Sequence, residues 1–66
     1  MAEKIRLGNQ AIKILNRLQK GPATNSELSR IALKYTSRIS DLRQMGYVIR
    51  IHSRNHETGE VRYILG

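Results

Sequence analysis

The sequence predicts one α+β domain in which three helices precede a two-stranded β-hairpin. Two patterns carry this prediction. Before Gly46, apolar residues recur every three or four positions, as in amphipathic helices, whereas after Gly46 they alternate with polar residues, as in strands. The chain has 66 residues, and a domain of this size buries only about 60% of its unfolded surface. We therefore expect a thin core within residues 9–66 and no spacious catalytic cleft.

The first helix is predicted to run from about Gln10 to Lys20. Asn9 is a favourable N-cap residue, and Gly21 followed by Pro22 is typical of a helix end. Its apolar side is expected to consist of residues at helical spacing, namely Ala11, Ile14, Leu15 and Leu18. Residues 1–8 precede this helix and are expected to form an N-terminal arm or a short strand.

A second helix is predicted to begin after Thr24. Thr24 and Glu27 have the spacing of a capping box, in which each side chain bonds the backbone amide of the other residue. The buried stripe of this helix is expected at Leu28, Ile31 and Ala32. Little chain then remains before the next apolar stripe, so a tight turn is expected near residues 32–34.

The third helix is predicted from Tyr35 to a stop at Gly46. Tyr35, Ile39 and Leu42 recur at spacings of four and three, which places them on one side of a helix facing the core. The other side is left polar and basic. Two short helices joined by a tight turn, with the second exposed and basic, form a helix-turn-helix arrangement. A helix bundle without a ligand is the structural alternative.

The residues after Gly46 predict a hairpin. Tyr47, Ile49 and Ile51 are expected on one face of a strand, with Val48, Arg50 and His52 on the other, and residues 61–65 form a second alternating run. The polar segment 53–60 between them contains Gly59 and predicts a loop of about five or six residues. A hairpin placed directly after an exposed helix is expected to act as a wing beside it.

Charge indicates the class of partner. Twelve Lys and Arg residues against five Asp and Glu residues give a net charge of +7. A small domain with this excess attracts polyanions, of which double-stranded DNA is the expected one. The basic residues are spread along the chain, which favours a folded binding surface over a disordered arm. A basic protein that binds acidic proteins, or that is merely soluble, is the alternative reading of the charge.

The sequence argues against catalysis, metals and cofactors. There is no cysteine, and His52 and His56 lie on a predicted strand and its loop, where a spacing of four gives no shared face. Glu57 and Glu60 are not accompanied by a partner base or a pocket. No apolar stretch approaches the length of about 20 residues needed to span a bilayer. We expect a cytoplasmic protein that is not an enzyme and has no cofactor.

Residues 38–43 (RISDLR), followed by Gly46 and Tyr47 and a hairpin that ends at Leu65, resemble the small winged helix-turn-helix proteins of bacteriophages and prophages. The resemblance implies a DNA-binding transcriptional regulator or recombination accessory factor whose third helix enters the major groove. In this segment Asp41 is expected to hold Arg38, or an arginine of the wing, in an ion pair.

The candidate DNA contacts are polar or basic residues on the third helix and at the hairpin tip. On the helix they are Lys34, Thr36, Ser37, Arg38, Ser40 and Arg43. On the wing they are Arg54, Asn55 and His56. One domain of this size covers one half-site, so a homodimer or cooperative binding on DNA is expected. The alternative function is a protein-binding module that modulates a host enzyme such as RNA polymerase or a nuclease.

Overall fold

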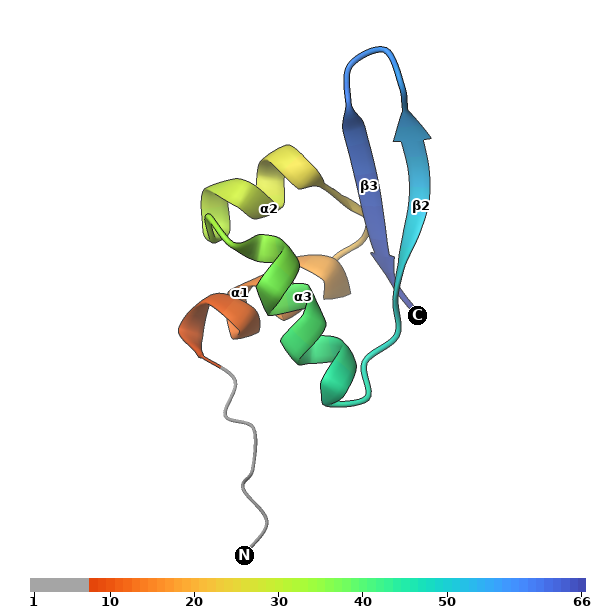
Figure 1. The fold of residues 1–66 in the computed structure, drawn as a ribbon. Coiled ribbons are helices and arrows are strands. Elements are labelled where there is room, and N and C mark those ends of the chain that lie inside the picture. Colours follow the sequence, from red (N-terminus) through yellow and green to blue (C-terminus); the bar gives the residue numbers. More distant parts are fainter. Residues whose placement is uncertain (1–7) are drawn as a thin grey trace, which may run out of the picture.

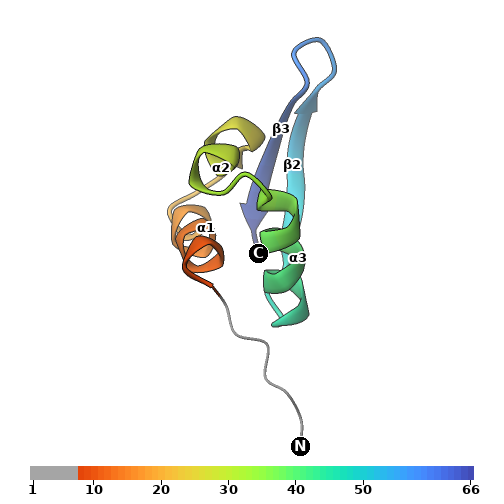
Figure 2. The ribbon, with the colours of Figure 1, turned by 60° about the vertical axis from the view of Figure 1, so that its left-hand side comes forward.

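The computed structural model describes residues 8–66, which form an α+β fold of three helices and a three-stranded antiparallel sheet. The elements follow in the order α1 (Asn9–Gln19), β1 (Ala23–Thr24), α2 (Asn25–Ile31), α3 (Tyr35–Gln44), β2 (Ile49–Asn55) and β3 (Glu60–Leu65) (Figure 1). The hairpin of β2 and β3 runs beside the helices, and its loop extends beyond α2 (Figures 1 and 2). The predicted N-terminal arm lies outside the described residues, except for Gly8.

Helix α1 begins one residue earlier than the sequence predicted. Gly8 is the N-cap, with φ −71° and ψ 169°, and Asn9 is already helical, so the prediction that Asn9 caps the helix was wrong. Gly8 has the extended backbone conformation of an N-cap residue, and no side-chain hydrogen bond caps the helix. The predicted end is confirmed, since Lys20 is the C-cap and Gly21 follows with φ 140°.

Helix α2 has the predicted capping box. The Glu27 amide donates to Thr24 Oγ1 over 3.1 Å, and the Thr24 amide donates to Glu27 Oε1 over 3.3 Å. Glu27 also accepts from Arg17 of α1, with 3.1 Å from Nε and 2.9 Å from Nη2 to Oε2. The same guanidinium donates to the carbonyls of Gly21 and Pro22, so Arg17 joins α1, the connection after it and α2.

Helix α3 follows after the predicted tight turn, residues 32–34, and ends as expected at a glycine. The Gly46 amide donates to the Arg43 carbonyl over 3.0 Å, and the Tyr47 amide donates to the Leu42 carbonyl over 3.1 Å. This pair of bonds is the Schellman motif, which requires a left-handed residue. Gly46 meets that requirement with φ 99°. The chain then turns into β2.

The sheet has one strand more than predicted. Its order is β1-β3-β2, because Ala23 and Thr24 pair with Tyr63 and Arg62 of β3. A two-residue strand has no alternation to reveal it, and it forms because β3 provides a partner. The predicted hairpin is confirmed, but its strands reach Asn55 and Glu60 and leave a loop of only residues 56–59. Ser53, Arg54 and Asn55 therefore belong to a strand rather than to the loop.

The core lies between the helices and one face of the sheet. It contains the predicted apolar side of α1 and buried residues from β1, α2, the turn after it, α3 and β2: Ala11, Ile14, Leu15, Leu18, Ala23, Leu28, Ala32, Ile39, Leu42 and Ile49. Tyr63 and Leu65 of β3 are partly buried against this core. Tyr35 packs at its margin as predicted. Ile51 and Tyr47 were expected beside Ile49, but Ile51 is 45% exposed and Tyr47 37% exposed. Tyr47 lies in the connection before β2, and β2 is an edge strand, whereas α1 and α2 both contact β3.

Within residues 8–66, no helix combines the length and the apolar character required to cross a bilayer.

Candidate nucleic-acid interface

The exposed side of α3 carries small neutral polar groups. Thr36, Ser37 and Ser40, all predicted contacts, are exposed, while Ile39 and Leu42 on the opposite side are buried. Gln44 is also exposed and follows Ser37 and Ser40 at helical spacing, so it extends the same side to the last turn. Our sequence reasoning omitted Gln44, although the spacing 37, 40, 44 indicates it. The hydroxyls and the amide can each donate and accept hydrogen bonds at base edges.

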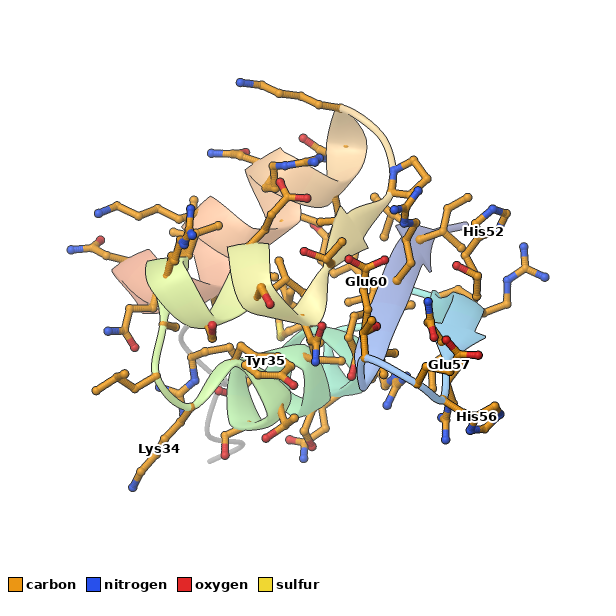
Figure 3. All side chains as sticks on the ribbon, turned by 90° about the horizontal axis from the view of Figure 1, so that it is seen from above. Lys34, Tyr35, His52, His56, Glu57 and Glu60 are labelled. Atoms are coloured by element: carbon orange, nitrogen blue, oxygen red, sulfur yellow. The ribbon has the colours of Figure 1, made fainter. Side chains whose placement is uncertain are left out.

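Lys34 lies at the start of this side. It is the N-cap of α3, it is exposed, and its side chain projects away from the helices (Figure 3). No side chain caps the helix, and its first turn contains no acidic residue. The positive end of the helix dipole and the Lys34 ammonium therefore lie together, an arrangement that attracts an anion.

Arg38 is held by a carboxylate, as predicted. Its Nε lies 3.2 Å from Asp41 Oδ2, and both side chains are about one-third exposed. The two groups form an ion pair but not a hydrogen bond. Arg38 Nε is buried and has no hydrogen-bond partner in the described part of the chain. Arg38 thus lies on the flank of α3, half-buried, with part of its charge offset by Asp41.

Arg43 has a structural role that the sequence did not reveal. Its Nε and Nη2 donate to the Ile49 carbonyl over 3.2 Å and 2.7 Å. These bonds tie the last turn of α3 to the first residue of β2. Arg43 still places a positive charge next to α3, but two of its three guanidinium nitrogens donate to the Ile49 carbonyl.

The hairpin loop is organised by Asn55. Its Oδ1 accepts from the amides of Glu57 and Thr58 over 2.9 Å and 3.4 Å, and its carbonyl accepts from the Gly59 amide over 2.9 Å. Asn55 is therefore first a loop-forming residue. His56 follows it at the tip, and in Figure 3 it lies at the lower right of the view and Lys34 at the lower left, whereas His52 lies higher at the right.

A β-bulge decides which side of the hairpin Arg54 occupies. Ile51 pairs with Tyr63 and Ser53 with Arg62, so His52 is an extra residue in β2. After the bulge, Arg54 pairs with Val61. Directly paired residues share a face of the sheet, so Arg54 lies on the face that carries Val61 and Tyr63. Simple alternation from Ile51 would have placed Arg54 on the opposite face.

The other two hairpin arginines lie on the opposite face. Arg50 pairs with Ile64, and Arg62 alternates with the core-facing Tyr63. Arg62 also contacts a carboxylate, with 3.4 Å between its Nη2 and Glu60 Oε2. Of the three arginines in β2 and β3, only Arg54 therefore shares a face with the helices.

Two half-buried tyrosines connect α3 with β3 on this face. The rings of Tyr35 and Tyr63 meet edge to face with centroids 6.1 Å apart. Burial raises the pKa of Tyr63 and the neighbouring Tyr35 adds to the rise, whereas the positive charges of Arg43 and Arg54 partly oppose it. The Tyr63 hydroxyl is therefore protonated at neutral pH and is a hydrogen-bond donor.

The described residues contain no group of three or more His, Cys, Asp or Glu side chains arranged to hold a metal ion, and no pocket opens between their elements.

Comparison of the chain with protein-family models, with curated proteins and with solved structures gave no match.

Proposed function

We propose that the protein is a winged helix-turn-helix DNA-binding protein, in which α2 and α3 form the helix-turn-helix and the β2–β3 hairpin is the wing. The observation that carries the proposal is the neutral polar side of α3, Thr36, Ser37, Ser40 and Gln44, beside a hairpin on a chain of net charge +7. A short helix with such a side fits the major groove of B-DNA, and its hydroxyl and amide groups can read base edges.

The proposed division of roles follows from the arginine contacts. Phosphate contacts come from the ends of the surface, that is from Lys34 at the start of α3 and from Arg54 and His56 on the wing. Arg38 and Arg43 add positive charge, but their bonds to Asp41 and Ile49 limit their reach into the groove. This arrangement suits a phage-type regulator of transcription or an accessory factor in recombination. Because one domain reads one half-site, the protein would act as a dimer or bind cooperatively.

Binding to random-sequence duplex DNA across a salt series tests the proposal. We expect the logarithm of affinity to fall linearly with the logarithm of salt concentration, with a slope of about −0.9 for each phosphate contacted. A Ser40→Glu variant places a carboxylate on the exposed side of α3 and is expected to bind at least about tenfold more weakly. Gln19→Glu makes the same charge change on α1 and is the matched control. Absence of binding at low salt, or equal effects of the two variants, would contradict the proposal.

A protein-binding module that modulates a host enzyme is the second candidate. The observation that favours it is Leu33 in the turn before α3, which is 92% exposed, an unusual position for a large apolar side chain. If a protein partner buries Leu33, the Leu33→Ser variant should bind that partner more weakly. Its binding to duplex DNA should change little. The salt series distinguishes the two functions, because an apolar contact lacks the steep salt dependence of phosphate contacts.

A further inference from the structure

Tyr35 of α3 and Tyr63 and Arg54 of the hairpin meet where α3 lies against the helix-facing side of the sheet. Tyr35 belongs to the first turn of α3 and Tyr63 to β3, and their rings are in contact. Arg54 shares the face of Tyr63 and lies two residue pairs further along the hairpin, opposite Val61. The electrostatic influence of both Arg43 and Arg54 reaches the Tyr63 hydroxyl.

The carboxylates of residues 8–66 are mostly engaged elsewhere. Glu27 is bound to Arg17, Asp41 lies beside Arg38, and Glu60 lies beside Arg62 on the other face of the sheet. Glu57 is in the hairpin loop. Arg54 has neither a carboxylate partner within 4 Å nor a side-chain hydrogen bond within this part of the chain. A guanidinium in this position attracts an oxyanion that the fold itself does not supply.

We propose that Arg54, together with the hydroxyls of Tyr63 on the same face and of Tyr35 against it, binds one backbone phosphate of duplex DNA on the helix-facing side of the hairpin. We name these three residues the tyrosine–arginine site. Arg43 contributes a fixed positive charge to it without direct contact, because its guanidinium is bonded to Ile49. This inference rests on the proposed function, and it assigns the main wing contact to the strand residue Arg54 rather than to His56 in the loop.

The chain provides its own matched control for the test. Arg50 and Arg54 are four residues apart on β2, both are exposed, and the register places them on opposite faces of the sheet. Arg54→Gln and Arg50→Gln therefore change the same charge on the same strand. Neither side chain is buried, so both variants are expected to fold, and thermal unfolding of each variant checks this.

Affinity for random-sequence duplex DNA is then measured across a potassium chloride series. We expect Arg54→Gln to weaken binding about tenfold at low salt and to reduce the magnitude of the salt slope by about 0.9, which corresponds to one phosphate. Arg50→Gln is expected to keep the slope and to change affinity less than about twofold. Tyr63→Phe removes only the hydroxyl, and we expect a loss of about threefold to tenfold in affinity with the slope unchanged, as for a neutral hydrogen bond.

The outcomes separate the two proposals. If the wild-type protein does not bind duplex DNA at low salt, the proposed function itself is wrong. If the wild-type protein binds but Arg54→Gln and Arg50→Gln have equal slopes, DNA binding stands and the tyrosine–arginine site is rejected. A smaller slope for Arg54→Gln alone, with weaker binding by Tyr63→Phe, supports the site.

Discussion

At the scale of single residues, the arginines show what sequence can and cannot predict. The ion pair of Arg38 with Asp41 follows from their spacing on a helix, and it was predicted and is confirmed. The bonds of Arg43 to the Ile49 carbonyl and of Arg17 to Glu27 join one element to a later one, so they depend on how these elements pack together. A backbone carbonyl acceptor leaves no trace in a sequence, so Arg43 was expected at the DNA surface alone.

Glu27 links the stability of the fold to pH. Its pKa is lowered from the ordinary value of 4.5, first by the hydrogen bond from Arg17 and then by the Thr24 amide. A lowered folded-state pKa stabilises the fold above the unfolded-state pKa, and this contribution is lost as the pH falls through the folded value. Stability should therefore decline as the pH drops below about 4.5, in part because Glu27 becomes protonated.

A Glu27→Gln variant isolates this contribution. Glutamine still completes a capping box but carries no charge. We expect its free energy of unfolding to be lower than wild type at pH 7, by less than about 1 kcal/mol because Arg17 and Glu27 are partly exposed to water. The difference should shrink as the pH falls towards 3. Urea unfolding at several pH values measures it, and a constant difference across that range would refute the assignment.

At the scale of elements, local chemistry made the helices more predictable than the sheet. Thr24 and Gly46 lie within a few residues of the groups they bond, and both helix boundaries were correctly predicted. Strand β1 exists only because β3 pairs with it, and the bulge at His52 arises only from the register between β2 and β3. Neither is encoded in local alternation. The face of Arg54, on which the tyrosine–arginine site depends, could therefore not be predicted from sequence.

Gly46 tests the end of α3. Its φ of 99° disfavours a side chain, although a Cβ atom there would meet no atom within 4 Å. We expect Gly46→Ala to lower the free energy of unfolding by about 1–2 kcal/mol through backbone strain alone. Gly46→Asn should cost less, because asparagine tolerates the left-handed region better. Chemical unfolding compares the two variants, and equal stability of wild type and Gly46→Ala would show that the Schellman motif contributes nothing.

At the scale of the whole molecule, one side chain of α2 links the helices to the loop end of the β2–β3 hairpin. The loop of the hairpin extends beyond α2 (Figure 1). On one side, the loop is held only by its continuity with strands β2 and β3. Asn25, at the start of α2, binds it from the other: its Nδ2 donates to the Gly59 carbonyl over 3.2 Å, and its Oδ1 accepts from the Val61 amide over 3.1 Å. These bonds continue the pairing of β1 with β3, which ends one residue earlier at Thr24.

Asn25 should therefore determine how rigidly the wing is held against the helices. Asn25→Ala removes both bonds, and we expect faster hydrogen exchange at the Val61 amide and a loss of about 1 kcal/mol in stability. Asn25→Asp retains the acceptor and should keep the Val61 amide protected while losing the bond to Gly59. Under the proposed function, a looser hairpin must be ordered when DNA binds, so affinity for DNA should fall in Asn25→Ala without a change in salt slope. Unchanged exchange at Val61 in Asn25→Ala would mean that the sheet alone positions the wing.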